Sequence, residues 1–172
     1  MRQTFMTAAV CITLLFAVCA CTGSPDPGRN AVFENSQSIN TDLDFDKVKN
    51  KDWVLSAIML DSETIIIDRT VLAEEGFGSY FTISFDNERV SGIGAPNRFF
   101  APYSLAEKQG ISINAIAGTL MAAIKEPENL KEHDYYAYLQ NVYRWNLVQG
   151  NLELSSKTQA GTEAILIFIS KD

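Results

Sequence analysis

The sequence predicts a mainly β protein, built as a small antiparallel β-barrel with one α-helix packed on it. Three observations predict this fold. Several short segments alternate apolar and polar residues with the period of two that strands show. Turn-forming pairs separate some of these segments, which favours antiparallel neighbours. One segment has helical periodicity instead. Closing the strands into a barrel is the usual way to remove exposed sheet edges.

The first expected strands lie at residues 52–60, 64–68 and 80–85. In the third, YFTISF, the side chains of Phe81, Ile83 and Phe85 share one face, which favours a strand with one buried side. The segments 52–60 and 64–68 are more continuously apolar, as expected for strands that are covered on both faces.

The remaining expected strands lie at 110–115, 144–149, 151–156 and 164–169, the last again continuously apolar. Tight turns are predicted at Asp86-Asn87 and at Gly150-Asn151. The large inward side chains expected from these patterns predict a barrel filled by its own residues. They are Trp53, Phe81, Ile83, Phe85, Leu152, Leu154 and Phe168.

The helix is expected within residues 126–142, where Tyr135, Tyr138, Leu139 and Val142 recur at helical spacing. Pro127 suits the first turn of such a helix, because its missing N–H has no partner there anyway. The preceding segment, 116–124, is ambiguous: its Ala, Leu and Met residues favour a helix, while its short length favours an extended buried segment. We expect it to be extended.

The N-terminus predicts export and a lipid anchor. Residues 1–20 have a weakly basic tip, a short apolar core and a small-residue exit, as in a secretory signal. The end of this segment, with Val18 and Ala20 before Cys21, resembles the lipobox of bacterial lipoproteins, in which the cysteine is acylated. The alternative is a secreted protein with an accidental cysteine at that position. We therefore expect a signal peptide at 1–20, a flexible acylated tether at 21–45 and a β domain at 46–172.

Cysteine and charge content exclude several functions. After Cys21 the chain has no thiol, so the domain has neither a disulfide nor a cysteine nucleophile. Removing residues 1–20 removes Arg2 and no acid, which leaves 13 basic and 21 acidic residues and a formal charge of −8. An acidic domain repels phosphate backbones, so no nucleic-acid partner is expected. Thr22 after the cysteine favours the outer membrane, with the domain facing the periplasm.

The domain resembles the META domain of HslJ-type heat-shock lipoproteins over residues 52–168. The resemblance rests on Trp53-Val54-Leu55, on residues 95–103 (APNRFFAPY), on residues 119–123 (TLMAA), on a helix that ends in Leu139, and on Leu152-Glu153-Leu154. It implies a small barrel with structural signature residues. Those residues are Trp53, Asn97, Phe99, Tyr103, Thr119 and Met121.

The chain departs from the family pattern at four positions. Pro96 and Ala123 stand where the signature has cysteines, and Ala95 and Ala101 stand where it has glycines. If those cysteines pair in relatives, their joint loss is expected, because one left alone would be an unpaired thiol. The missing crosslink would cost about 2–4 kcal/mol of stability, which packing must offset.

The Gly92-Ile93-Gly94 stretch resembles a nucleotide-binding loop only superficially. The third glycine of a dinucleotide motif would fall at Asn97, and no βαβ unit surrounds it. We expect the glycines to let a strand bend at a barrel corner. Asn97 is expected to satisfy backbone groups of the turn, with ligand contact as the alternative.

Catalytic and metal chemistry have little support. His133 lies on the polar side of the expected helix, and the acidic run at residues 42–46 lacks the glycine and glutamate of a calcium loop. We expect no enzyme activity, no cofactor and no metal. The resemblance leads us to expect an accessory, stress-associated envelope lipoprotein, held at the membrane by Cys21, that contacts an unidentified envelope protein. The alternative is a carrier of an apolar ligand, because the fold also resembles the lipid-binding pilotins. An enzyme is the third and least supported reading.

Overall fold

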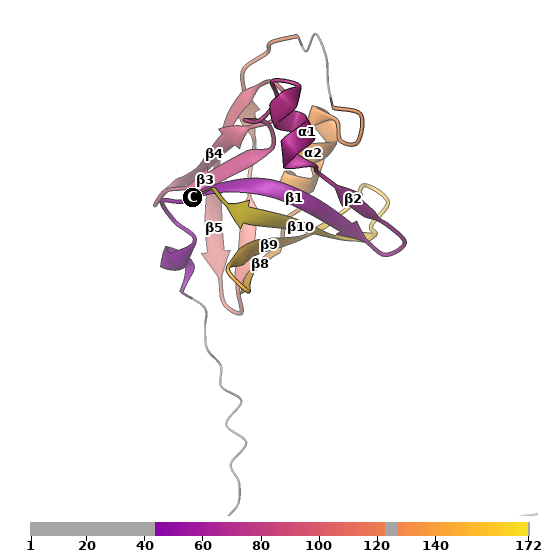
Figure 1. Ribbon diagram of the computed structural model, residues 1–172. Helices are drawn as coiled ribbons and strands as arrows, with labels where there is room; N and C mark the ends of the chain where they lie inside the picture. Colours follow the sequence, from indigo (N-terminus) through magenta and orange to yellow (C-terminus); the bar gives the residue numbers. More distant parts are fainter. Residues whose placement is uncertain (1–43, 123–126, 172) are drawn as a thin grey trace, which may run out of the picture. The chain divides into compact units, whose positions relative to one another are not determined.

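The computed structural model describes residues 44–122 and 127–171, which lie in one compact unit (Figure 1). Cys21 and Ala123 lie outside the described residues. The helical elements are η1, a 3₁₀ turn at Phe45–Lys47, α1 (Arg69–Glu74) and α2 (Glu132–Gln140). The strands are β1 (Asp52–Leu60), β2 (Thr64–Ile66), β3 (Thr82–Phe85), β4 (Arg89–Ile93), β5 (Arg98–Ala106), β6 (Gly110–Ile113), β7 (Ala117–Gly118), β8 (Arg144–Val148), β9 (Asn151–Lys157) and β10 (Glu163–Ser170).

Eight of the strands close into an antiparallel barrel, as predicted. The order around it is β1-β3-β4-β5-β6-β8-β9-β10, and β10 pairs with β1 to complete the circle (Figure 1). The short strand β2 pairs with residues 57–59 of β1, and β7 pairs with Phe99 and Phe100 of β5. The narrowest seam is β6–β8, with one register pair, Gly110 and Arg144. Closure leaves few unpaired edges on the barrel strands.

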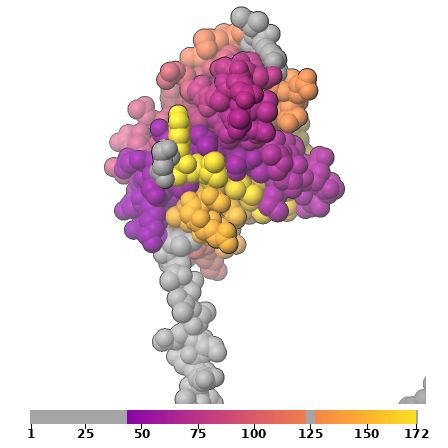
Figure 2. Space-filling view, in the orientation of Figure 1, coloured from indigo at the N-terminus to yellow at the C-terminus, as the bar shows by residue number. Residues whose placement is uncertain are grey.

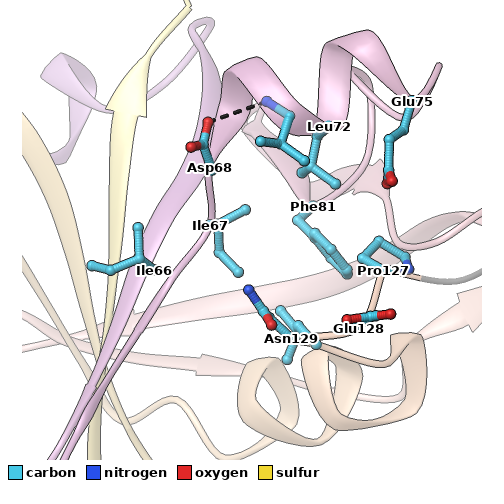
Figure 3. Close-up of a pocket in the computed structure, with 11 residues that line it drawn as sticks. Ile66, Ile67, Asp68, Leu72, Glu75, Phe81, Pro127, Glu128 and Asn129 are labelled. Atoms are coloured by element: carbon cyan, nitrogen blue, oxygen red, sulfur yellow. Dashed lines mark hydrogen bonds between the residues drawn. The ribbon is translucent and has the colours of Figure 1, made fainter.

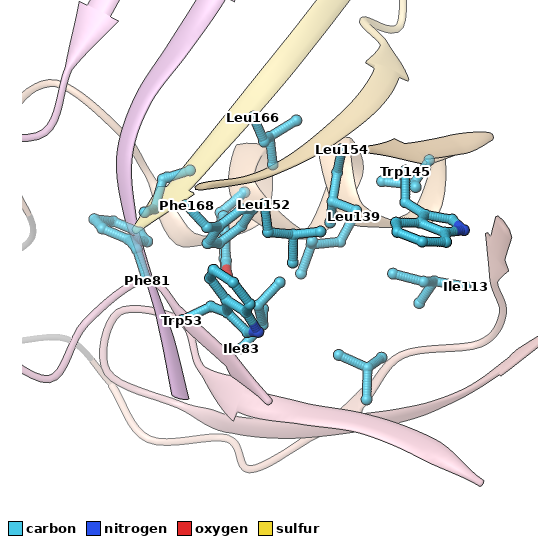
Figure 4. Close-up of a cluster of buried hydrophobic side chains, with 14 of the residues drawn as sticks. Trp53, Phe81, Ile83, Ile113, Leu139, Trp145, Leu152, Leu154, Leu166 and Phe168 are labelled. Carbon is cyan, nitrogen blue, oxygen red and sulfur yellow. The ribbon is translucent and has the colours of Figure 1, made fainter. Parts of the chain in front are cut away.

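Large side chains fill the barrel interior (Figure 4). All seven side chains predicted to point inward, from Trp53 to Phe168, are at most 1% exposed. At one end Phe45 of η1 inserts among aromatic rings, with ring-centroid distances of 5.2 Å to Phe85 and 4.9 Å to Trp145. Tyr135 and Leu139 of α2, both fully buried, add to the same core. The predicted packed core is confirmed.

The helix α2 is shorter than predicted. It begins at Glu132, so Pro127 and Glu128 precede it instead of forming its first turn. Pro127 is buried in the segment before α2, and Lys131 takes the N-cap position without a side-chain cap. The buried face of the helix, Tyr135 and Leu139, follows the predicted spacing because those two side chains pack into the barrel.

Three further expectations fail locally. Residues 64–68 are not a strand covered on both faces: β2 has three residues, and Ile66 is 58% exposed. A second helix, α1, follows at once, starting after Asp68, whose carboxylate caps the helix by accepting hydrogen bonds from the N–H groups of Thr70 and Val71. In the described part of the segment 116–124, residues 116–122, only β7 is a strand, and Leu120 is fully exposed instead of buried. The sequence did not predict α1, because a helix of six residues is too short to show a periodic pattern.

The two predicted turns differ in accuracy. Asp86-Asn87 does connect β3 to β4, and the Asp86 carboxylate accepts hydrogen bonds from the N–H groups of Glu88 and Arg89, both at 2.8 Å. These hydrogen bonds hold the pKa of Asp86 below its usual value. The second turn is one residue off: Gln149 and Gly150 take positive φ angles of 53° and 86°, and Asn151 already pairs with Val148.

Candidate functional site

Three of the signature residues secure separate parts of the barrel. The indole Nε1 of Trp53 donates a hydrogen bond to the carbonyl of Val48, 3.0 Å away, which fixes the segment after η1. The Tyr103 hydroxyl donates to the carbonyl of Asp86 at 2.7 Å. Phe99 packs edge-on against Tyr136 of α2, with ring centroids 5.3 Å apart. Each contact is a packing or backbone interaction inside the domain.

Asn97 connects the β4–β5 loop to the segment after β7. Its side-chain oxygen accepts hydrogen bonds from the Thr119 hydroxyl at 2.8 Å and from the Met121 N–H at 2.7 Å. Its Nδ2 group donates to the Met121 carbonyl at 3.2 Å. Asn97 therefore meets two signature residues that lie 22 and 24 positions further along the chain. Asn97 does not satisfy backbone groups of its own turn, as the sequence had suggested, but those of a distant segment.

Glu132, at the start of α2, instead accepts the hydrogen bonds of the backbone N–H groups in this turn. Its Oε1 atom accepts from the backbone N–H groups of Ala95 and Asn97 at 2.6 and 2.7 Å, and its Oε2 atom accepts from Asn97 Nδ2 at 2.7 Å. The Tyr136 hydroxyl lies 3.2 Å from Oε1 and 3.2 Å from the Asn97 carbonyl. Burial, and then the charge of Glu132, raises the pKa of the Tyr136 hydroxyl.

We call Asn97, Thr119, Met121, Glu132 and Tyr136 the signature cluster. Its polar side chains all have partners within the cluster or on the adjoining backbone, which is the arrangement of a structural network. Sequence reasoning missed Glu132 and Tyr136. The available signal was a glutamate four residues before a tyrosine on the predicted helix, and this spacing places the two on one helix face.

Gly92 and Gly94, the glycines of the Gly92-Ile93-Gly94 stretch, lie where no side chain fits. A Cβ on Gly92 would lie 1.9 Å from the carbonyl oxygen of Thr82, and one on Gly94 would lie 2.6 Å from Glu132 Oε1. Neither glycine has a positive φ angle. Close approach of neighbouring groups therefore accounts for both residues. The expected bend of the strand stays a prediction.

A hollow of about 170 Å³ lies outside the barrel, between α1 and the segment before α2 (Figure 3). Phe81, Leu72 and Ile67 form part of its apolar lining, while the carboxylates of Asp68, Glu75 and Glu128 stand around it (Figure 3). We call it the α1 pocket. The described residues that line it are Ile66, Ile67, Asp68, Val71, Leu72, Glu75, Phe81, Pro127, Glu128, Asn129 and Leu130.

A second apolar surface runs along the outside of β1 and β10, which lie side by side across the face shown in Figure 2. Met59 is 45% exposed and Ile169 is 37% exposed. The side chains alternate with those that point into the core, so this stripe belongs to the outer wall. The cross-strand pairs on this wall are Val54 with Ile169, Ala57 with Ile167, and Met59 with Ile165, but Val54 and Ala57 are buried, at 7% and 9% exposed.

A larger hollow of about 530 Å³ crosses the outer face of β3, β4 and β5. Hydroxyl side chains and Phe100 line it, together with charges of both signs, such as Asp86 and Arg89, which form an ion pair at 3.3 Å. Phe100 is 51% exposed, whereas its neighbour Phe99 on the other face of β5 is buried. Because charges of both signs line it, this surface does not favour a partner of one particular charge.

The sequence of the described barrel matches one known family. A model of the META domain matches residues 46–168. The chain belongs to the META domain family. The family resemblance inferred from the sequence is therefore correct. In this META domain, Asn97 ties the β4–β5 loop to α2, and with Thr119 and Met121 it ties that loop to the segment after β7.

A solved structure shares the fold of this META domain. A protein from Burkholderia xenovorans, solved by NMR, is 18% identical with a TM-score of 0.55 over 92% of this chain and 99% of that chain. A DUF4847 family protein from Bacteroides vulgatus is 14% identical with a TM-score of 0.48 over 74% of this chain and 98% of that chain. The first likeness supports the fold alone. No curated protein matches the sequence.

Two further candidates for chemistry in the META domain are a metal site and the His133 side chain. Within residues 44–122 and 127–171, no group of three or more His, Cys, Asp or Glu residues is placed to hold a metal. The His133 side chain is 77% exposed and lies 3.1 Å from the Asp134 carboxylate. Among the described residues, no helix has the length and apolar character needed to cross a membrane.

Proposed function

We propose that this META protein is a lipid-anchored accessory protein of the bacterial cell envelope that acts by contacting another envelope protein and not by catalysis. In this proposal acylated Cys21 holds it at the outer membrane, and the tether presents the barrel to the periplasm. The supporting observation is the filled barrel, whose largest inward side chains, including Trp53, Phe81 and Phe168, are at most 1% exposed.

A filled core argues against the alternative of an apolar-ligand carrier. Barrels that hold a guest leave a cavity, whereas this one is occupied by its own aromatic and aliphatic side chains from the Phe45 end to α2. Admitting a guest would expose side chains whose burial contributes about 1.5–3 kcal/mol each. Binding at the outer surface requires no such displacement.

The outer surface offers an apolar contact site at the α1 pocket. Ile66 and Val71 line the α1 pocket, and they are 58% and 48% exposed. Residues that dominate protein–protein affinity lie in well-packed pockets from which water is excluded when the partner binds. The pocket therefore provides the kind of recess in which a partner side chain could be desolvated.

Site-specific photo-crosslinking in the native cells tests this function. With a photoreactive amino acid at position 71, we expect one defined adduct with another envelope protein, because Val71 borders the α1 pocket. Position 148, a valine that is 37% exposed and outside the pocket, is the matched control and should give none. The Cys21→Ser change should release the chain from membranes and weaken the adduct. Equal crosslinking at both positions, or none at either, would count against the proposal.

A further inference from the structure

The size of the α1 pocket limits its occupant. Its volume is about 170 Å³. A cavity of about 150 Å³ takes a benzene-sized guest, and sites for drug-sized ligands span about 300–1,000 Å³. The α1 pocket therefore suits a single apolar side chain of a partner. Leu72 and Phe81, which are buried beneath it, provide an apolar floor against which such a side chain can pack.

The charge of the α1 pocket is of one sign. Among the described residues that line it, Asp68, Glu75 and Glu128 are acidic and none is Lys, Arg or His. Two basic residues are next to lining residues in sequence. Lys131 is the N-cap residue of α2, and the Arg69 guanidinium donates hydrogen bonds to the carbonyls of Tyr80 at 2.9 Å and Gly78 at 2.6 Å. The formal charge of the whole chain is also negative, at −7. Both the local and the overall field favour a cationic partner.

The position of Asp68 is fixed by the fold. Its carboxylate accepts the N–H groups of Thr70 and Val71, so it stays at the edge of the pocket (Figure 3). Glu128 lies across from α1, on the segment before α2 (Figure 3). Cationic groups on both sides of an inserted side chain would each meet a carboxylate. A membrane lipid fits less well, because an anionic headgroup would lie beside these carboxylates.

We propose that the α1 pocket binds a segment of a partner protein in which one apolar side chain, such as Leu or Phe, is flanked by Lys or Arg residues. The apolar side chain enters the recess and supplies most of the affinity. The basic residues pair with the carboxylates of Asp68 and Glu128 and supply orientation and selectivity. This inference rests on the proposed function, since it names the chemistry of the partner that the barrel would contact.

Peptide titration against the full chain, purified in a neutral detergent, tests the inference. Three short peptides of equal length carry one central Phe flanked by Lys, the same Phe flanked by Glu, or a central Ser flanked by Lys. We expect the Phe–Lys peptide to bind at least tenfold more tightly than either of the others. Its affinity should also fall as salt rises, because screening weakens the rim contacts.

Variants of the chain locate the binding. Asp68→Asn removes the charge but keeps a side chain that can cap α1. The double variant Asp68→Asn, Glu128→Gln should therefore bind the Phe–Lys peptide at least fivefold more weakly. Its melting temperature should change little. Val71→Trp should block the recess. Val148→Trp, the same change at another exposed valine, should leave binding unchanged. Thermal melts of every variant show whether the fold is retained.

Several results would overturn the inference. They are equal binding of the Glu-flanked peptide, absence of binding at millimolar peptide, and binding that survives Val71→Trp. Vesicles of phosphatidylglycerol that bind the chain and lose that binding in Val71→Trp would assign the pocket to a lipid surface instead. If peptides fail while the position 71 crosslink persists, the proposed protein contact stands and only the partner chemistry is wrong.

Discussion

Changing Gly92 to alanine should destabilise the barrel by about 3 kcal/mol or more, at the upper end of the range for overpacking. Gly92 lies in β4 opposite Ile83 of β3. The added Cβ would meet the Thr82 carbonyl oxygen at 1.9 Å and a ring carbon of Phe99 at 2.9 Å. The first of these is a backbone atom, so rotation of a side chain cannot relieve the clash. The two strands must separate locally, and in a closed barrel the neighbouring pairs are strained as well.

The measurement is urea unfolding followed by tryptophan fluorescence, with the shift in midpoint read at constant slope. Gly150→Ala is the matched control, because nothing lies within 4 Å of its Cβ and only its φ of +86° opposes a side chain. A non-glycine residue in the left-handed region costs about 1–2 kcal/mol. If the two variants unfolded at the same urea concentration, the close approach at Gly92 would not be the reason for that glycine.

Removing the Glu132 carboxylate should cost about 2–4 kcal/mol, since each buried donor left without a partner costs about 1–3 kcal/mol. In Glu132→Ala the N–H groups of Ala95 and Asn97 lose their acceptor, and the Asn97 amide loses one of its two. The loop between β4 and β5 would then lose its connection to α2. We expect the amide resonances of residues 95 and 97 to shift strongly in NMR spectra of the folded variant.

The control for this change is Glu128→Ala. Glu128 is four residues earlier and exposed, so its removal should change stability by less than about 0.5 kcal/mol. Identical urea midpoints for the two variants would show that the Glu132 hydrogen bonds contribute little. A large loss of stability in Glu128→Ala would show instead that the segment before α2 depends on the charge of Glu128.

Several strands were predictable because barrel strands with one buried face must alternate, whereas no range was predicted for β4 or β5. Residues 80–85 and 151–156 show this alternation directly, and their inward side chains are buried as expected. The resemblance to the META domain also drew attention to Asn97, Thr119 and Met121. Their shared role was not predictable, since it depends on a hydrogen-bond cluster that forms only when the β4–β5 loop, the segment after β7 and α2 meet.

The candidate site was much less predictable than the fold. The α1 pocket arises between a six-residue helix and the segment at 127–130, and neither gave a periodic signal. The apolar run at residues 64–67 was interpreted as part of a strand buried on both faces, while the structure exposes Ile66 beside the pocket. Apolar content alone does not distinguish a buried strand from an exposed contact residue.

Native mass spectrometry of the chain purified from its own membranes tests the central claim, a barrel filled by its own side chains, most directly. After detergent is removed in the gas phase, we predict the mass of the mature protein with its covalent lipid and no other bound apolar molecule. Organic extraction of the same sample should release no stoichiometric fatty acid or phospholipid. A stoichiometric lipid that is lost on unfolding would contradict a filled barrel and would favour an apolar-ligand carrier.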